Sequence, residues 1–324
     1  MREGKLTNEQ LKSIIFSRLK PRRGDILMRS GVGIDAAALE IGDEACVLTT
    51  DPITAADAWA GSLAIHICCN DLAACGAKPA MALVTLLAPP ECSITDIERT
   101  VSDMADAAET LGIEVAGGHT EVTNAVRRLV ISTTAVGTVS KGKLIFPGGA
   151  KEGDSLVMSK WAGLEGTTII TSDHADKIEG VLTADETAEA AGLKKHISVV
   201  PEGLIGAEVN VHAMHDITEG GVLGAAWEMA EAAGLGIEIY EDDIPVLPVT
   251  SKLCKHLRLD AKKLISSGCM LFAHPDGDQL VAGLRESGIP AKAIGRFTGE
   301  GRVLVTGGNR TAIEPPEADE IYKL

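Results

Sequence analysis

Aspartates beside predicted strands and inside one apolar helix are the residues of this sequence best suited to metal or phosphate chemistry. Asp35 follows a glycine-bearing loop, Asp51 ends the apolar run 46–50, and Asp71 lies within the otherwise apolar segment 62–76. A carboxylate among apolar side chains must be paired, protonated or bound to a cation. Asp35 could instead form a turn and Asp51 could cap a strand. Magnesium together with nucleotide phosphates is a natural partner for such carboxylates.

Two glycine-containing segments could approach an anion. Gly117–Thr120 follows a predicted short strand, and its backbone N–H groups and threonine hydroxyl could bind phosphate. The segment 215–221 precedes an apolar helical run, and helix N-termini attract anions. The simpler alternatives are a tight turn for the first segment and an N-cap by Thr218 for the second. Lys160, after a predicted strand, could add a point charge toward phosphate.

Several common motifs are absent from the sequence. No Gly-x4-Gly-Lys-Ser/Thr occurs, which excludes a P-loop. The segment 31–36 resembles a dinucleotide fingerprint, but no strand precedes it. His212 and His215 lie outside a recognisable helix, which argues against a catalytic zinc pair. The seven cysteines include no Cys-x-x-Cys pair, so neither a disulfide framework nor a structural zinc site is expected.

Composition narrows the class of protein. The 324 residues carry a formal charge of −16, with 45% hydrophobic and 3% aromatic residues. This acidity argues against nucleic acid or an anionic membrane as a partner. No apolar run is long enough to span a bilayer, and the N-terminus lacks the apolar core of a signal peptide. We expect a soluble cytoplasmic protein of about two domains.

The first half of the chain predicts an α/β domain over residues 1–146. A short helix at 7–19 opens with a Thr7-x-x-Gln10 capping box. The expected elements then follow the order β-α-β-α-β-β: strand 46–50, helix 62–76, strand 81–88, helix 95–111 with a second capping box, and strands 113–116 and 129–139. Strand 129–139 is apolar on both faces, so we expect it to be covered on both sides.

The second half predicts another α/β domain over residues 147–324. A turn-rich stretch at 146–149 separates the two periodic regions. The expected strands are 154–159, 236–239, 269–273 and 291–296, and the expected helices are 186–196, 221–233 and 250–257.

Five short segments that contain these candidate residues resemble segments of the AIR synthase-related (PurM-like) superfamily. They occur in the same order as in the family and are spread over most of the chain. They are Gly33–Ala37, Thr49–Asp51, Asn70–Pro79, Gly117–Val122 and His215–Gly221. Asn70–Pro79 is the most specific of them. Within the superfamily the sequence is most similar to the hydrogenase expression/formation (HypE-type) branch.

The resemblance implies a two-domain chain that forms a homodimer through its N-terminal sheet, with ATP and Mg²⁺ bound near the dimer interface. It implies metal ligation by Asp35, Asp51 and Asp71. It implies nucleotide binding by Thr50, Asn70, Gly117, Gly118, Thr120, Lys160, Gly220 and Gly221. It implies catalytic roles for Asp216, Glu219 and His119.

The sequence also departs from this family pattern. Gly33-Ile34-Asp35 stands where many members have Gly-Asp-Asp, and His119 stands where several members have an acid. HypE-type members end in a cysteine, whereas this chain ends with Leu324. The leading hypothesis is an enzyme that activates an amide- or acyl-type oxygen of a small-molecule or protein acceptor by phosphoryl transfer from ATP. The alternatives are a non-catalytic nucleotide-binding or maturation scaffold, and a hydrogenase-maturation dehydratase acting without a terminal cysteine.

Overall fold

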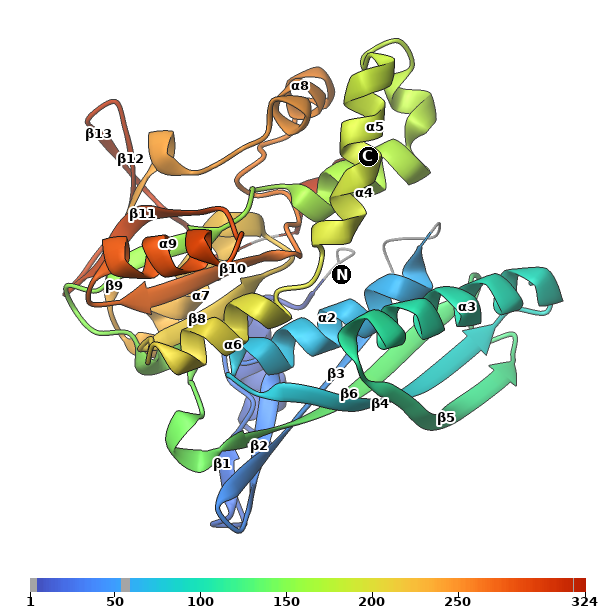
Figure 1. Cartoon of the computed structure of the whole chain (residues 1–324), viewed down its shortest axis with the longest axis horizontal. Helices are drawn as coiled ribbons and strands as arrows, with labels where there is room; N and C mark the ends of the chain where they lie inside the picture. Colours follow the sequence, from blue (N-terminus) through green and yellow to red (C-terminus); the bar gives the residue numbers. More distant parts are fainter. Residues whose placement is uncertain (1–4, 54–58, 317) are drawn as a thin grey trace.

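The strands of this chain form two mixed sheets (Figure 1). The computed structural model describes residues 5–53, 59–316 and 318–324. The first sheet has the strand order β1-β2-β3-β6-β4-β5, and the second has the order β13-β12-β9-β11-β7-β10-β8. The change from one sheet to the other falls between β6 and β7, and the predicted boundary at residue 146 lies in this interval. The predicted α/β fold with two sheet domains is confirmed.

The N-terminal sheet carries its helices on one face (Figure 1). Its strands are β1 (Ile26–Met28), β2 (Ala36–Ile41), β3 (Glu44–Ile53), β4 (Lys78–Ala88), β5 (Glu114–Val122) and β6 (Val130–Ser140). Its helices are α1 (Asn8–Gln10), the π-helical segment η1 (Leu11–Phe16), α2 (Ala60–Ala74) and α3 (Ile94–Leu111). The short 3₁₀ segments η2 (Lys141–Lys143) and η3 (Pro147–Gly149) follow. The sequence did not predict β1 and β2, because β1 is short and β2 is rich in alanine, which is depleted in strands.

Helix α2 is apolar all round because it is buried from two directions. It packs on β3, β4 and β6 and against α3, and it also contacts α6 and β8 of the second domain. Leu63 and Leu72 are fully buried as a result. This location places the one carboxylate of the helix, Asp71, at the junction of the two domains.

Among the described residues of the protomer, no layer covers the other face of the N-terminal sheet (Figure 1). Alternate side chains of β4 and β6 point to it: Leu83 is 41% exposed and Val136 is half-buried, while Val84 and Ala135 face the helices. The expectation that strand 129–139 is covered on both sides is therefore not met by this chain alone.

The C-terminal domain combines its sheet with helices that are shorter than α2 and α3. Its strands are β7 (Ser155–Ser159), β8 (Ala213–Ile217), β9 (Gly236–Tyr240), β10 (Cys269–His274), β11 (Ala291–Thr298), β12 (Arg302–Thr306) and β13 (Asn309–Ala312). Its α-helices are α4 (Leu164–Asp173), α5 (Ala184–Gly192), α6 (Val200–Glu208), α7 (Gly221–Ala233), α8 (Pro248–Leu257) and α9 (Gly277–Glu286). Its 3₁₀ segments are η4 (Ala175–Ile178), η5 (Leu193–His196), η6 (Glu241–Asp243) and η7 (Glu320–Lys323).

Two local predictions are corrected by the structure. The capping box at Thr7 is present, but α3 is capped two residues earlier than predicted, by Ser93, whose hydroxyl accepts a hydrogen bond from the Asp96 backbone N–H. The predicted turn at Gly117–Thr120 is part of the continuous strand β5. Gly118 has a φ of 148°, and a Cβ there would lie 1.8 Å from the Val84 carbonyl oxygen, so this glycine permits close pairing with β4.

All seven cysteines are free thiols. Among the described helices, none combines the length and the apolar character that crossing a membrane requires.

Candidate active site

Carboxylates from both domains line one cavity. Asp35 and Asp51 reach it from the start of β2 and from β3, and Asp71 reaches it from α2. The C-terminal domain adds Glu165 and Glu219. The cavity has a volume of about 90 Å³, and its apolar lining includes side chains of α2. We call it the interdomain cavity.

Asp71 is the most deeply buried of these acids. Thr49 Oγ1 lies 2.6 Å from Asp71 Oδ2 and 3.0 Å from the Asp35 carbonyl oxygen. The Thr49 hydroxyl is the donor in both contacts, and it shares its one hydrogen between the two acceptors. Burial, with the charges of Asp216 and Asp51, raises the pKa of Asp71 well above its ordinary value. Burial also raises the pKa of Asp51, whose side chain hydrogen-bonds with Asp71. For Asp51, the effect of burial outweighs the opposing charge of Lys5.

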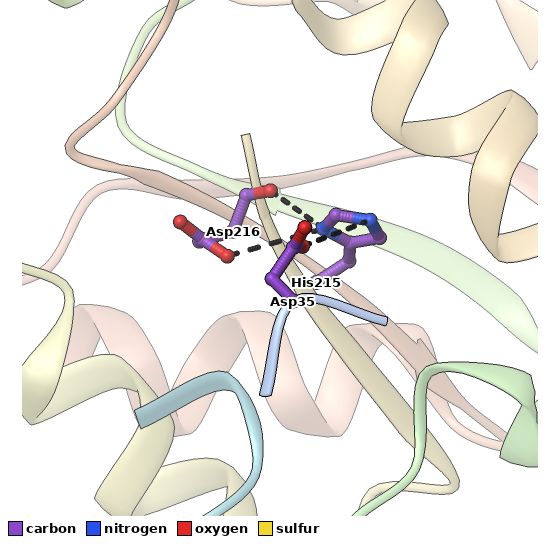
Figure 2. Close-up of side chains that lie close together, drawn as sticks. All are labelled: Asp35, His215 and Asp216. Carbon is purple, nitrogen blue, oxygen red and sulfur yellow. Dashed lines mark hydrogen bonds and ion pairs between the residues drawn. The ribbon is translucent and has the colours of Figure 1, made fainter. Parts of the chain in front are cut away.

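A second cluster joins Asp35 to β8 (Figure 2). One ligand atom each from Asp35, His215 and Asp216 lie within 4.8 Å of one another. His215 Nε2 is 3.9 Å from Asp35 Oδ2 and 3.5 Å from Glu228 Oε2 of α7. Burial lowers the pKa of His215, but hydrogen bonding to Glu228 and the nearby carboxylates outweigh it and raise that pKa to about 9. The carboxylates around His215 therefore favour its protonated form, in which it is a counter-ion to them.

Asp216 lies between the two clusters. It is buried, and its Oδ2 atom has no hydrogen-bond partner among the described residues. Burial and the charge of Asp35 raise its pKa to about 7, although His215 opposes the shift. Asp216 and Asp71 line the same small space behind the interdomain cavity. A buried carboxylate oxygen without a donor is a site that a cation would satisfy.

The acidic cluster fits a hard divalent cation. Mg²⁺ prefers oxygen ligands and is often held by one or two carboxylates together with phosphates. Asp35, Asp51 and Asp71 supply such oxygens. The one basic side chain among the described residues that line the interdomain cavity is Lys5. Desolvation lowers the pKa of Lys5, but the charges of Asp35, Glu219 and Glu228 raise it above its ordinary value.

The structure brings together Asp35, Asp51, Asp71, Asp216 and Glu219, as the sequence predicted. Thr50 does not join them: it is exposed, accepts a hydrogen bond from Thr134, and alternates with Thr49 across the strand. The residue of this strand that contacts Asp71 is Thr49, which was not predicted.

Asn70 holds the two domains together. Its amide nitrogen donates to the Ile197 carbonyl oxygen at 2.9 Å, and its amide oxygen accepts from the Val199 N–H at 2.8 Å. The side chain is fully buried. Both ends of the amide are thus occupied by backbone, away from the cavity.

The segment Gly117–Thr120 lies on the outer edge strand of the N-terminal sheet (Figure 1). Its residues are exposed, and His119 contacts Glu121 at 3.3 Å. Strands β4 and β6 separate β5 from β3 and its Asp51. Within the protomer, this segment and its histidine do not reach the acidic cluster.

Lys160 is buried in an ion pair with Glu202. Its Nζ lies 2.7 Å from Glu202 Oε1 and donates to the carbonyl oxygens of His196 and Ser198 at 2.9 and 2.6 Å. Two of its N–H donors are thus used by backbone carbonyl oxygens, and the ammonium charge is paired with Glu202. The phosphate role of Lys160 stays a prediction, and these contacts favour a structural role instead.

The N-terminus of α7 is already occupied. The Gly220 N–H donates to Asp319 Oδ2 at 2.7 Å, and the Gly221 N–H donates to the Thr218 carbonyl oxygen at 3.1 Å. The predicted phosphate contacts of Gly220 and Gly221 are thus made within the chain. Both residues have positive φ angles, and Gly221 packs against backbone, which explains the glycines.

Sequence reasoning missed several residues at the cavity: Thr49, His215, Glu165, Ser267 and Lys5. His215 could have been predicted, because it precedes Asp216 in the segment His215–Gly221 that the sequence analysis had already identified. Glu165 and Ser267 carried none, because isolated Glu and Ser residues resemble ordinary surface positions.

Comparisons with known proteins agree with this architecture. Residues 33–139 match the family model "AIR synthase related protein, N-terminal domain", and residues 151–307 match that of the C-terminal domain. A Methanocaldococcus jannaschii protein named for hydrogenase expression/formation is 30% identical, covering 99% of this chain and 97% of its own length. The carbamoyl dehydratase HypE of Cupriavidus necator is 30% identical, covering 76% and 69%.

The fold also matches a solved structure. The hydrogenase maturation protein HypE in complex with ATP superposes with a TM-score of 0.73 at 24% identity, covering 89% of each chain. The relatives named as dehydratases confirm the expectation of an enzyme. With both family models matched and a relative aligned along nearly its whole length, this chain belongs to the AIR synthase-related family and is close to its HypE-type members.

Proposed function

We propose that this protein is a Mg²⁺- and ATP-dependent enzyme that activates an amide- or acyl-type oxygen by phosphoryl transfer. The observation that carries the proposal is the convergence of five acids around two spaces: Asp35, Asp51, Asp71 and Glu219 line the interdomain cavity, and Asp216 lines the smaller space that shares Asp35 and Asp71 with it. Phosphoryl transfer depends mainly on positioning and charge neutralisation. The HypE structure that holds ATP has the same fold, which supports the choice of nucleotide.

ATP is strongly anionic, so this acidic site can bind it only with cations. Mg²⁺ held by Asp35, Asp51 and Asp71 would neutralise phosphate charge and polarise the transferred group. The raised pKa values of Asp51 and Asp71 support this assignment, because they show buried carboxylates whose charge is not fully compensated. Lys5 adds a positive charge at the same cavity.

The C-terminal domain would supply the groups around the acceptor. Asp216 has a free carboxylate oxygen. Glu219 is oriented by Tyr322, whose hydroxyl donates to Glu219 Oε1 at 2.9 Å. In the proposed reaction the acceptor oxygen attacks the γ-phosphorus and ADP leaves. For a primary amide, the nitrogen then loses both protons and forms a C≡N bond as the C–O bond breaks and phosphate leaves. Relatives named carbamoyl dehydratase support an amide-type oxygen.

The acceptor is proposed to be a free small molecule or a separate protein, not the tail of this chain. Lys323 pairs with Glu320 at 2.5 Å, and Ile321 is buried in the core. A paired, protonated lysine is a poor nucleophile. Intact-chain mass spectrometry after incubation with ATP and carbamoyl phosphate should therefore show no adduct that maps to residues 318–324.

We also propose a homodimer formed through the open face of the N-terminal sheet. That face presents Leu83 and the half-buried Leu48 and Val136. An apolar sheet face of this kind is normally covered. A partner subunit there would also provide contacts for His119 and the rest of Gly117–Thr120, which are exposed in the single chain. A cytoplasmic location stays a prediction.

One observation favours the scaffold alternative. The Gly220 and Gly221 N–H groups and the Lys160 ammonium, which were expected to bind phosphates, are all occupied within the chain. A protein that binds nucleotide without turning it over would account for this arrangement.

The test separates the two functions. Calorimetry should show that Mg²⁺-ATP binds and that EDTA abolishes binding. Phosphate release is then measured with carbamoyl phosphate and with simple primary amides. Acceptor-dependent release supports the enzyme, whereas binding without release for any acceptor supports the scaffold. Binding of ATP that is indifferent to Mg²⁺ contradicts the metal assignment.

A further inference from the structure

An N-terminal segment of the chain, residues 5–16, lies beside the interdomain cavity, and we call it the N-terminal strap. Its first residue, Lys5, lines the cavity. The strap also lines an adjoining groove of about 340 Å³, which shares Lys5, Asp35 and Glu219 with the cavity and continues to Pro316. The strap therefore extends from the acidic cluster to the surface of the C-terminal domain.

Lys5 places a positive charge among the acids of the cavity. It is the one basic residue among the described residues that line this space. Desolvation lowers the pKa of Lys5, but nearby carboxylates outweigh that effect and raise the pKa above its ordinary value. These carboxylates belong to Asp35, Glu219, Glu228 and Asp51. The attraction that stabilises the ammonium also holds it beside the acids, so Lys5 acts as an internal cation.

The strap is attached weakly to the rest of the protein. None of its residues is buried, and Leu6, Ile14 and Ile15 are 37%, 48% and 38% exposed. One of its contacts with α7 is an ion pair of 2.6 Å between Lys12 Nζ and Glu231 Oε1, in which the lysine side chain is 53% exposed. Exposed ion pairs contribute little to stability, because solvent screens them. A segment with so few buried contacts detaches at a small cost in free energy.

A divalent cation and the Lys5 ammonium need the same carboxylates. Asp35 and Asp51, whose charges act on Lys5, are proposed ligands of Mg²⁺. The ammonium binds carboxylates through its N–H donors, whereas Mg²⁺ binds the carboxylate oxygens directly. The two cations would also repel each other at this distance. Occupation of these oxygens by one cation therefore disfavours the other.

We propose that the N-terminal strap is an autoinhibitory element in which Lys5 occupies the acidic cluster and excludes a divalent cation. A cation that binds displaces Lys5 and loosens the strap. By linkage, a change that releases the strap strengthens metal binding, and metal binding releases the strap. The inference rests on the metal site of the proposed function and adds regulation to it. The exclusion applies to the cation only, since the charge of Lys5 still attracts phosphate.

The first test measures binding of Mn²⁺ alone, without nucleotide, to the full chain. Mn²⁺ prefers oxygen ligands as Mg²⁺ does, and electron paramagnetic resonance counts the free ion. Lys5→Met removes the charge and keeps a long side chain, so it should bind Mn²⁺ at least threefold more tightly than the wild type. Lys5→Arg keeps the charge and should stay within twofold of the wild type. The matched control is Lys20→Met, which changes an exposed lysine outside the strap and should leave the affinity unchanged.

Glu231→Gln separates displacement of the strap from a simple effect of charge. It removes a negative charge from α7, so electrostatics alone predict weaker binding of a cation. It also removes the charge that holds Lys12, so a loosened strap predicts Mn²⁺ binding about twofold to fivefold tighter. Glutamine can still accept a hydrogen bond from Arg302, which also pairs with Glu231. Weaker Mn²⁺ binding in Glu231→Gln would contradict displacement.

Amide hydrogen exchange measures movement of the strap itself. Saturating Mg²⁺ should at least double the exchange rates of the amides of residues 6–16 in the wild type. Exchange in the central strand β6 should be the same in every variant, which shows that the variants are folded. Slower exchange of the strap with Mg²⁺ would overturn the inference, because it would mean that the strap closes over the metal. Mn²⁺ affinity that is unchanged or weaker in Lys5→Met would overturn it as well.

The proposed function fails separately. If the strap variants bind Mn²⁺ more tightly but no acceptor-dependent phosphate release occurs, the autoinhibition is confirmed and only the proposed reaction is wrong. If Mn²⁺ binds every variant with equal affinity, the autoinhibition is wrong while the metal site stands. If Mn²⁺ binds none of them, Lys5→Met included, both are wrong.

Discussion

The carboxylate of Asp319 accepts a hydrogen bond of 2.7 Å from the backbone N–H of Gly220, 99 positions earlier in the chain. The same carboxylate accepts hydrogen bonds from the Ile265 and Ile321 N–H groups at 3.2 and 2.9 Å. The C-terminal segment is thus attached to the start of α7 and to the loop that carries Ser267. The C-terminal segment therefore supports two segments that line the interdomain cavity, and these contacts bury Asp319.

Asp319 should make stability depend on pH. Burial raises its pKa from 3.8 to about 6 in the folded protein. A raised folded-state pKa means that the folded state holds the proton more tightly, so this stabilisation is complete below about pH 4 and is lost as the pH rises through 6. We expect the wild type to lose roughly 1–3 kcal/mol relative to Asp319→Asn between pH 4 and pH 7.

Urea unfolding at pH 4, 5, 6 and 7 checks this prediction. The control is Asp278→Asn, which changes an exposed aspartate of α9. A constant difference in unfolding free energy between wild type and Asp319→Asn across the series would contradict the assignment.

Replacing Asp71 should separate ligand binding from stability. Asp71→Asn removes a charge-assisted contact to the metal, so Mg²⁺-ATP should bind more weakly by roughly 1–3 kcal/mol. The same change removes a buried carboxyl group from a cluster of acids, so Tm without ligand should not fall.

Calorimetry and thermal unfolding in parallel measure both effects. Asp43→Asn, in the exposed turn between β2 and β3, serves as the matched control. Wild-type affinity in Asp71→Asn, or binding that does not depend on Mg²⁺, would exclude Asp71 as a metal ligand.

The Lys160–Glu202 ion pair should matter for folding rather than for nucleotide binding. Lys160→Met leaves Glu202 buried and unpaired, and breaking such a pair typically costs about 3–5 kcal/mol. The double variant Lys160→Met/Glu202→Leu removes both charges and should recover most of that loss.

A double-mutant cycle by urea unfolding measures the coupling between the two side chains. Mg²⁺-ATP affinity in the double variant should equal that of the wild type. A folded double variant that no longer binds Mg²⁺-ATP would restore the phosphate role predicted for Lys160 from the sequence.

A charge on the open face of the N-terminal sheet should break the proposed homodimer. Leu83→Arg places a cation where we expect the partner subunit to pack, and burying an unpaired charge there is costly. Light scattering should give twice the 33.8 kDa chain mass for the wild type and the single-chain mass for Leu83→Arg.

Ile94→Arg is the matched control, because Ile94 is 70% exposed at the start of α3, on the opposite layer. It should remain a dimer. If light scattering shows that the wild-type protein is already monomeric at micromolar concentration, the proposed homodimer is wrong.

The sequence by itself determined the fold and singled out the acids that we propose as metal ligands. Hydrophobic periodicity located α2 and α3, because a helix buried on one or all sides must repeat apolar residues at helical spacing. Asp71 was identifiable because a carboxylate in an apolar helix has few explanations. Asp35, Asp51 and Asp216 were identified because the short segments around them resemble those of the family. Such segments specify the types of residue, but they do not show which residues contact one another.

Only the tertiary structure decided which predicted groups are free to bind a ligand. The sequence showed a lysine after a strand and a glycine before a helix. It could not show that Glu202 pairs with this lysine or that Asp319 binds the Gly220 N–H, because these contacts join residues far apart in the chain. It also could not distinguish Thr49 from Thr50, since that choice depends on which face of the sheet the helices cover.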